Sequence, residues 1–170
     1  MTIVLHPAAL DPQDFLSQCS LARTRGGGPG GQRRNKVQTA VRLVHRPTGL
    51  TVTATERRSS EENRKAALSR LRLKVAIDVR CPAGQAYQPS EMWRRRCRRG
   101  TVSINPRHDD FPAMIAEALD VVATCGLDMA AAAKALNCTS SQLVRILKLE
   151  PSALALVNQK REQQGLHRMV

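Results

Sequence analysis

Aromatic residues are almost absent from this chain of 170 residues. Two Phe, one Trp and one Tyr make up 2% of it, although apolar residues as a whole make up 42%. Aliphatic side chains and alanine must therefore fill the interior, and the bases of a single-stranded nucleic acid would find no row of rings on which to stack. The length is that of one ordinary domain, or of a small domain with a comparably small extension.

Long hydrophobic runs are missing as well. No segment approaches the roughly 20 consecutive apolar residues of a membrane-spanning helix, and the N-terminus lacks the basic start and apolar stretch of a secretory signal. We therefore expect a cytoplasmic protein without a membrane partner. The five cysteines form no C-x-x-C pair and the four histidines show no ligand spacing. We accordingly expect reduced thiols, no disulfide framework, no metal site and no cofactor.

Acidic residues are too few to balance the basic ones. Lys and Arg number 27 against 14 Asp and Glu, which gives a formal net charge of +13 and a pI near 10.8. Residues 20–80 hold 15 bases and 4 acids, residues 81–107 hold 6 and 1, and residues 108–170 hold 6 and 7. The positive charge therefore belongs to the middle of the chain, and such a charge favours a polyanionic partner.

The first half of the sequence predicts an α+β fold, in which a small mixed or antiparallel sheet packs against one long helix. The expected elements are a helix at 11–18 and strands at about 19–24, 39–44 and 50–55. Asp11 and Pro12 are typical of the start of the short helix. Ser59 or Ser60 should cap the long helix, because two glutamates follow in the first turn and an apolar face extends from there.

The second half predicts a small all-helical C-terminal region. Its expected helices span about 112–124, 128–136, 139–149 and 151–164. Residues 81–90 contain two prolines and a glycine and are typical of a linker, and five arginines follow before residue 100. We therefore divide the chain into a first domain at 1–80, a linker with an arginine-rich cluster at 81–107, and a helical region at 108–170.

Residues 129–147 resemble a helix-turn-helix, which leaves two interpretations open. The first is reading of DNA by the second helix, and the other is packing or docking of a protein partner. The second helix carries only Arg145 and Lys148 as bases, and residues 108–170 are slightly negative as a whole. Because DNA binding depends on positive charge, packing or docking of a protein partner is favoured for this region.

A glycine-rich segment at residues 25–32 (RGGGPGGQ) fits no regular element and predicts a loop. It contains the G-x-G-x-x-G spacing of a dinucleotide-binding fingerprint, but Pro29 interrupts the turn and the acid required about 20 residues later is missing. A phosphate-binding P-loop is excluded because Gln32 and Arg33 stand where that motif needs Lys and Ser or Thr. A disordered Arg-Gly segment is the third alternative, and the strands expected directly after the loop argue against it.

The loop is the first of several short motifs in a fixed order. After Gly28-Pro29-Gly30-Gly31-Gln32 come Asn35-Lys36-Val37, residues 39–43 (TAVRL), His45, Pro47-Thr48-Gly49, Glu56-Arg57, Glu62-Asn63-Arg64 and Ala67-Leu68. In this order the motifs resemble the catalytic domain of class I peptide chain release factors, over roughly residues 15–80. The resemblance implies the fold of that domain, and an enzyme that hydrolyses the ester between a peptide and its transfer RNA on the ribosome.

The resemblance also implies roles for individual residues. Gly30, Gly31 and Gln32 would be catalytic, with the Gln32 backbone N–H stabilising the charge that develops at the ribose oxygen and the Gln32 side chain admitting water. Gly28 and Pro29 would shape the loop. The flanking bases would contact RNA phosphates, namely Arg23, Arg25, Arg33, Arg34 and Lys36. No catalytic triad or carboxylate pair accompanies the loop, so the ribosomal RNA and peptidyl-tRNA would supply the remaining groups.

Two departures from the family pattern affect these expectations. Arg33 and Arg34 stand where relatives commonly have His-Val, which would alter the local fit to the ribosome. Only about 19 residues precede the first expected strand, too few for codon-reading domains. We therefore expect codon-independent hydrolysis on stalled ribosomes, as in the stand-alone ribosome-rescue hydrolases.

Rescue hydrolases commonly end in a basic tail, whose nearest equivalent here is an arginine cluster followed by about 70 near-neutral residues. We expect this cluster to bind ribosomal RNA: Arg94, Arg95, Arg96, Arg98 and Arg99. Residues 108–170 would then fix the factor to a further ribosomal or protein site. Simple solubilisation is the alternative role for the arginines. For the whole chain, the alternative is an RNA- or ribosome-binding adaptor that keeps the fold and docks nucleic acid or protein through its helical region.

Overall fold

The computed structural model describes residues 5–24, 39–82, 84 and 87–169. Contacts within the chain divide it into two compact units. The sheet unit is Leu10–Val75, and the helical unit is Met1–Ala9 together with Ala76–Val170. The functional boundaries expected at residues 80 and 107 stay a prediction.

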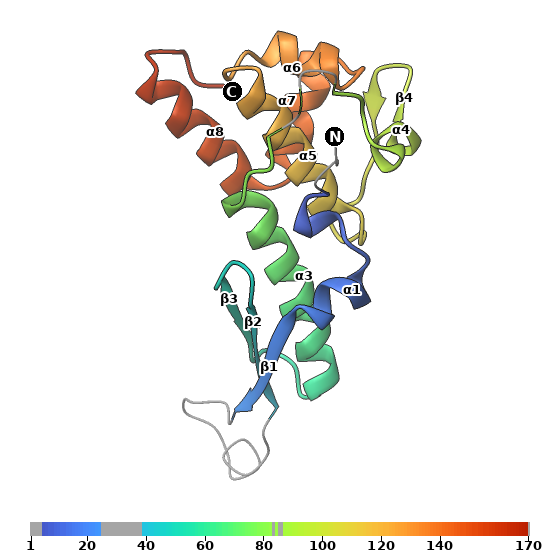
Figure 1. Ribbon diagram of the computed structural model, residues 1–170, viewed down its shortest axis with the longest axis vertical. Coiled ribbons are helices and arrows are strands. Elements are labelled where there is room, and N and C mark those ends of the chain that lie inside the picture. Colours follow the sequence, from blue (N-terminus) through green and yellow to red (C-terminus); the bar gives the residue numbers. More distant parts are fainter. Residues whose placement is uncertain (1–4, 25–38, 83, 85–86, 170) are drawn as a thin grey trace. The chain divides into compact units, whose positions relative to one another are not determined.

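The sheet unit combines a three-stranded antiparallel sheet with a short helix and a long one (Figure 1). In chain order the elements are α1 (Pro12–Ser17), β1 (Cys19–Thr24), β2 (Ala40–His45), β3 (Thr51–Ala54) and α3 (Ser60–Asp78), of which the part up to Val75 belongs to this unit. The strand order is β1-β2-β3, and both pairs are antiparallel. The α+β fold class is therefore confirmed, and each predicted element lies within a few residues of its expected place.

Local side-chain hydrogen bonds set where the helices of the sheet unit begin. The Asp11 carboxylate accepts a hydrogen bond from the backbone N–H of Gln13 at 2.9 Å, as expected for the cap of α1. The Ser59 hydroxyl accepts one from the backbone N–H of Glu61 at 3.2 Å, so Ser59 caps α3. Such caps satisfy N–H groups that have no partner inside the helix.

The core of the sheet unit contains one face of β2 and one side of α3. Val41, Leu43 and His45 alternate along β2 and are all fully buried, because every second residue of a strand points to the same face. Leu71 is buried on α3. The imidazole of His45 stacks on the ring of Phe15, with centroids 4.7 Å apart, and burial lowers its pKa. His45 therefore serves this core as a neutral aromatic ring at pH 7.

The helical unit contains all the remaining elements (Figure 1). They are η1 (Pro7–Ala9), α4 (Glu91–Arg96), β4 (Cys97–Arg98), β5 (Thr101–Val102), α5 (Phe111–Thr124), α6 (Met129–Ala135), α7 (Ser140–Lys148) and α8 (Pro151–Gln163). Helices α5 to α8 correspond to the four helices expected from the sequence. The all-helical C-terminal region is thereby confirmed.

Helix α5 is the centre of the helical unit. It contacts η1, α6, α7 and α8, and its residues are buried around almost the whole helix, including Met114 and Ile115. A helix that is apolar all round needs such a complete cover. The half-buried carboxylate of Glu117 accepts hydrogen bonds from the Tyr87 hydroxyl at 2.5 Å and from the backbone N–H of Ser90 at 2.7 Å. Helix α5 thereby holds the segment that leads into α4.

Helix α4 and the hairpin of β4 and β5 were not expected from the sequence. The Ser90 hydroxyl caps α4 by accepting a hydrogen bond from the backbone N–H of Trp93 at 3.0 Å. Arg99 and Gly100 connect the two strands with φ angles of 50° and 76°, and positive φ at both positions is what a tight two-residue hairpin turn requires. Strands of two residues are too short to produce a periodic pattern, so only the turn could have indicated them.

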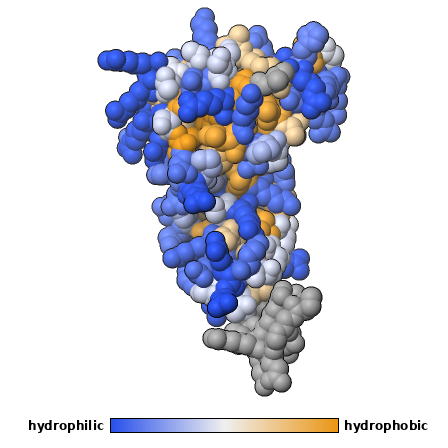
Figure 2. All heavy atoms as spheres, turned by 180° about the vertical axis from the view of Figure 1, so that it is seen from behind, coloured by the Kyte–Doolittle hydropathy of each residue, from blue (hydrophilic) through white to orange (hydrophobic). Residues whose placement is uncertain are grey.

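Polar side chains cover most of the described residues on the face that Figure 2 shows. On the face shown in Figure 2, the hydrophobic residues gather over the helical unit among hydrophilic ones. Four large hydrophobic side chains are exposed among the described residues, namely Leu5, Leu21, Leu149 and Leu166. In the same part of the chain, every helix is too short or too polar to cross a membrane.

Candidate functional site

Strands β1 and β2 form the stem of the predicted catalytic loop. They pair in antiparallel register with Thr24 opposite Ala40, so the two ends of the loop are held side by side at one end of the sheet. The loop residues themselves lie outside the described residues, and the predictions that fall there are those for Arg25, Gly28, Pro29, Gly30, Gly31, Gln32, Arg33, Arg34 and Lys36. Their roles stay predictions.

The side chain of Asn63, on α3, anchors the stem. It is fully buried, and its Nδ2 donates hydrogen bonds to the backbone carbonyls of Thr39 at 2.7 Å and Arg57 at 3.0 Å. Its Oδ1 accepts a hydrogen bond from the backbone N–H of Arg57 at 2.9 Å. Asn63 thus connects Thr39, the first described residue after the loop, to the turn that precedes α3. It was not among the predicted site residues, although the sequence resemblance includes it.

Exposed bases surround the stem within the sheet unit. Arg23 on β1, which we predicted to contact RNA, is exposed, and so is Arg42 on β2. Arg57 and Arg58 are exposed in the turn that Asn63 ties to the stem. Arg42, Arg57 and Arg58 were not among the predicted RNA-binding residues. The charge density of the sequence does not reveal which bases lie beside the stem once the chain has folded.

The five clustered arginines of the helical unit have different environments. Four are exposed, namely Arg94, Arg95, Arg98 and Arg99. Arg95 is paired with Glu91, one turn earlier on α4. Arg96 is half-buried and forms an ion pair of 2.8 Å with Asp110 at the start of α5. Arg96 therefore joins two elements of the helical unit, whereas the other four face outward.

Residues 16–112 match the RF-1 domain family, a segment that contains the predicted loop, its stem, Asn63 and the arginine cluster. This protein belongs to the RF-1 domain family. The match begins inside α1 and ends at the start of α5. The assignment agrees with the resemblance to class I release factors.

Relatives of this RF-1 domain protein carry release-factor names. Peptide chain release factor PrfB1 of Arabidopsis thaliana chloroplasts is 54% identical over 54 residues, which is 32% of this chain. Peptide chain release factor 1 of Chloroherpeton thalassium is 40% identical over 88 residues, or 52% of this chain. An uncharacterized mitochondrial peptide chain release factor-like protein of Saccharomyces cerevisiae is 46% identical over 76 residues, or 44% of this chain. The matched segments cover 12%, 24% and 46% of these three relatives, respectively.

A second group of chemically reactive side chains lies in the helical unit of this RF-1 domain protein. Possible ligand atoms of His6, Cys81 and Asp120 lie within 4.8 Å of one another. However, His6 Nδ1 accepts a hydrogen bond from the backbone N–H of Ala8 at 3.0 Å, and Nε2 donates one to the carbonyl of Val79 at 3.1 Å. Burial lowers the pKa of His6 to about 4, so the ring is neutral. Because both ring nitrogens are engaged, we assign the group to the packing of the unit.

The anchoring role of Asn63 in the RF-1 domain predicts a large effect of a small change. Replacing Asn63 by aspartate keeps the shape of the side chain but removes both N–H donors, which leaves the carbonyls of Thr39 and Arg57 facing a buried carboxylate. We expect the free energy of unfolding of the sheet unit to fall by about 2–4 kcal/mol, measured by native-state hydrogen exchange of β2 and β3.

Asn105→Asp is the matched control for Asn63→Asp. The Asn105 side chain is exposed and accepts a hydrogen bond from the backbone N–H of Arg107 at 2.8 Å, which a carboxylate can accept equally well. This control should change stability by less than about 0.5 kcal/mol. An equally small effect of Asn63→Asp would contradict the anchoring role.

Proposed function

We propose that this protein is a ribosome-dependent peptidyl-tRNA hydrolase, which releases nascent peptides from stalled cytoplasmic ribosomes without reading a codon. The observation that carries the proposal is the sequence GPGGQ at residues 28–32, inside the RF-1 domain match and between two paired strands. The release-factor names of the relatives support the same activity. The chain spans less than half the length of these relatives, so the activity of the whole protein is part of the proposal.

The proposed reaction is the hydrolysis of one ester. Water attacks the carbonyl carbon, the bond from this carbon to the ribose oxygen breaks, and the peptide leaves with a new carboxyl group. The ribose oxygen gains a proton and becomes a hydroxyl. The backbone N–H of Gln32 would donate a hydrogen bond to that oxygen while negative charge develops on it, and a donor of this kind contributes about 2.7–4 kcal/mol. The Gln32 side chain would admit water and exclude larger nucleophiles.

In the described part of the sheet unit, no histidine is free to act as the general base for this reaction. Its single histidine, His45, is fully buried, and its two ring nitrogens lie 2.8 Å from the Thr48 hydroxyl and 3.2 Å from the Gln18 side-chain oxygen. A base must reach the proton that it removes, either directly or through one water. We therefore assign the remaining catalytic groups to the ribosomal RNA and the peptidyl-tRNA. The exposed arginines beside the stem would contact phosphates and position the loop.

Peptide release from purified ribosomes tests the proposal. Ribosomes carrying labelled peptidyl-tRNA are prepared on messages that end at the P site, that continue with a sense codon, or that continue with a stop codon. We expect this protein to release peptide from the truncated complex, and to show no preference for the stop codon over the sense codon. Free peptidyl-tRNA without ribosomes should stay intact.

The same experiment separates the competing functions. Release that requires a stop codon would assign this protein to codon-dependent termination. Binding to the ribosome without release from any of the three complexes would leave an adaptor that retains the RF-1 domain fold. Hydrolysis of free peptidyl-tRNA would contradict the dependence on ribosomal groups.

A further inference from the structure

The helical unit carries a group of exposed bases that its own acids do not neutralise. Residues 91–102 and 129–148 together hold eight bases and one acid, Glu91. Six of these bases are exposed and form no ion pair among the described residues, and we call them the basic surface: Arg94, Arg98, Arg99, Lys134, Arg145 and Lys148. Like charges at close range raise the free energy of the protein alone, so this surface is suited to an anionic partner.

The hairpin and α7 are held together by hydrogen bonds. The backbone N–H of Thr139 donates to the carbonyl of Gly100 at 3.4 Å. The side-chain oxygen of Gln142 accepts hydrogen bonds from the backbone N–H of Val102 at 3.3 Å and from the Arg145 guanidinium at 3.4 Å. Since Arg99 and Gly100 form the turn of the hairpin, these contacts place its arginines next to the first turns of α7.

Helix α4 is attached to the same place. The fully buried ring of Trp93 donates a hydrogen bond from Nε1 to the carbonyl of Leu136, just after α6, at 2.8 Å. The Cys97 thiol reaches the carbonyl of Asn137 in the following turn at 3.4 Å. The bases of α4, the hairpin, α6 and α7 therefore belong to one continuous part of the helical unit, although Arg94 and Lys148 are 54 positions apart in the sequence.

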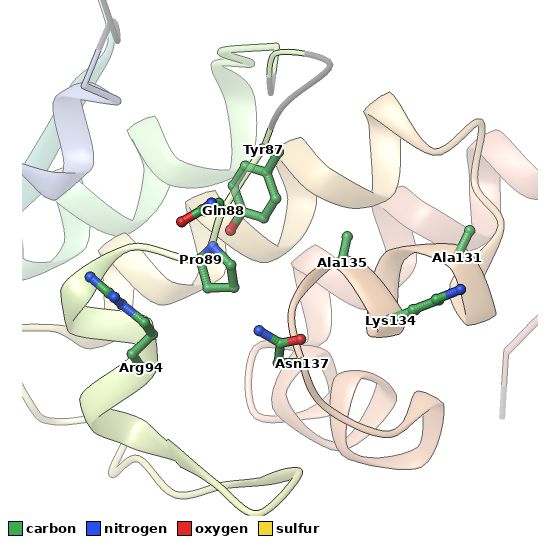
Figure 3. A pocket seen from close by; sticks show the side chains of 8 residues that line it. All are labelled: Tyr87, Gln88, Pro89, Arg94, Ala131, Lys134, Ala135 and Asn137. Carbon is green, nitrogen blue, oxygen red and sulfur yellow. The ribbon is translucent and has the colours of Figure 1, made fainter.

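An open pocket of about 690 Å³ extends this surface between α4 and α6. Arg94 comes from α4 on one side of the pocket and Lys134 from α6 on the other, as Figure 3 shows. The amide of Asn137, from the turn after α6, also lines it. Arg94 and Lys134 thus border the pocket from opposite sides, and the amides of Gln88 and Asn137 lie between them, so a phosphate group at this surface would find polar groups here as well.

The side chains of this surface are suited to phosphates and not to bases. The exposed residues that follow one another along α7 are Ser141, Arg145 and Lys148, and the amide oxygen of Gln142 is already occupied by the hairpin. All four aromatic residues are described: three are fully or almost fully buried, and the hydroxyl of Tyr87 is bound to Glu117. The half-buried ring of Tyr87 is thus the one aromatic ring that lines the pocket, and a row of exposed rings on which unpaired bases could stack is missing.

From these observations we infer that the basic surface binds the phosphate backbone of double-helical RNA without reading its sequence. A helix-turn-helix flanked by a basic hairpin offers phosphate contacts from several elements at once, which suits a duplex. Double-stranded RNA is recognised through its backbone and shape, because its deep major groove is closed to side chains. The choice of RNA over DNA rests on the proposed ribosomal function, whereas the binding of a duplex backbone rests on the geometry alone.

Direct binding to a labelled RNA duplex of about 20 base pairs tests this inference, with fluorescence anisotropy measured over a series of salt concentrations. The test variant of the full chain is Arg98→Gln, Arg99→Asn and Arg145→Gln, in which asparagine tolerates the positive φ of the hairpin turn. We expect it to bind at least about 30-fold more weakly at 0.1 M salt, and to lose roughly three units from the slope of log K against log salt. Arg98→Lys with Arg145→Lys keeps the charge and should keep most of the affinity.

A matched control changes the same number of charges elsewhere in the helical unit, through Arg107→Gln, Lys160→Gln and Arg168→Gln. This control should lose less than about threefold in affinity. Equal losses in both triple variants, or failure of the wild type to bind RNA duplex, would overturn the inference and leave a protein partner for this surface. Equal binding to a DNA duplex of the same sequence would overturn the assignment to RNA.

The two proposals fail in different ways. Gln32→Ala changes the predicted catalytic loop and should leave the binding of the RNA duplex unchanged. Loss of duplex binding in the Arg98, Arg99 and Arg145 variant should occur with an unchanged unfolding transition, which excludes a folding defect. Peptide release by the wild type without any duplex binding would contradict only the inference that the basic surface binds RNA. The proposed peptidyl-tRNA hydrolysis would still stand.

Discussion

Replacement of Gln32 by proline is expected to slow peptide release by about 100- to 1000-fold, because proline has no backbone N–H to donate to the ribose oxygen. Replacement of Gln32 by alanine retains that N–H and removes only the side chain. We expect its release by water to be closer to that of the wild type, and its selectivity against larger nucleophiles to be lower. The measurement is the single-turnover rate of release from ribosomes saturated with each variant.

Proline also restricts the residue before it, so the effect of the missing N–H must be separated from a change in the backbone. Gly31→Ala reports on the backbone part, since alanine at residue 31 narrows the torsions of the loop and leaves the N–H of Gln32 in place. Ribosome binding is measured in parallel for each variant. A release rate for Gln32→Pro within about threefold of the wild type would contradict the proposed role of the Gln32 backbone N–H as a hydrogen-bond donor in the reaction.

Replacement of Trp93 by alanine is expected to destabilise the helical unit by about 3–5 kcal/mol. The ring is fully buried, and its Nε1–H is bonded to the carbonyl of Leu136. Removing it leaves a large cavity and detaches α4 from the turn between α6 and α7. The measurement is chemical denaturation of the full chain, with hydrogen exchange to assign the loss to α5, α6 and α7.

Trp93→Phe separates packing from hydrogen bonding. Phenylalanine fills most of the space but leaves the Leu136 carbonyl without its donor, which should cost about 1–3 kcal/mol. Exchange protection in the sheet unit should be the same in both variants and in the wild type. A loss below about 1 kcal/mol for Trp93→Ala would show that the ring does not hold α4 in place.

Local chemistry made most of the regular elements predictable. Asp11, Asp128 and Thr139 each accept hydrogen bonds from the N–H groups of the helix that follows, and Pro151 occupies the first turn of α8. Such signals act within a few residues of the chain, so they can be recognised without the tertiary structure. The alternation of β2 was predictable for the same reason, because one of its faces is buried.

Neighbouring residues with the same side chain can nevertheless have different roles. Arg96 and Arg98 lie in one arginine cluster, yet Arg96 is paired with Asp110 and Arg98 is exposed. The position of each side chain depends on where α4 ends and the hairpin begins, and the strands of that hairpin are too short to leave a pattern. Asn63 was missed in a similar way, since its partner Thr39 is 24 residues away in the sequence.

The sequence by itself determined the α+β class, the helix caps at Asp11, Asp128 and Thr139, the excess of positive charge, and the motif order that led to the release-factor resemblance. These properties depend on residue type and on spacing along the chain. Only the tertiary structure decided that Asn63 anchors the stem of the loop, and that arginines of α4 and the hairpin join Arg145 and Lys148 on one basic surface. Those arrangements arise from contacts between residues far apart in the chain, and their geometry is defined only after the helices and strands have packed.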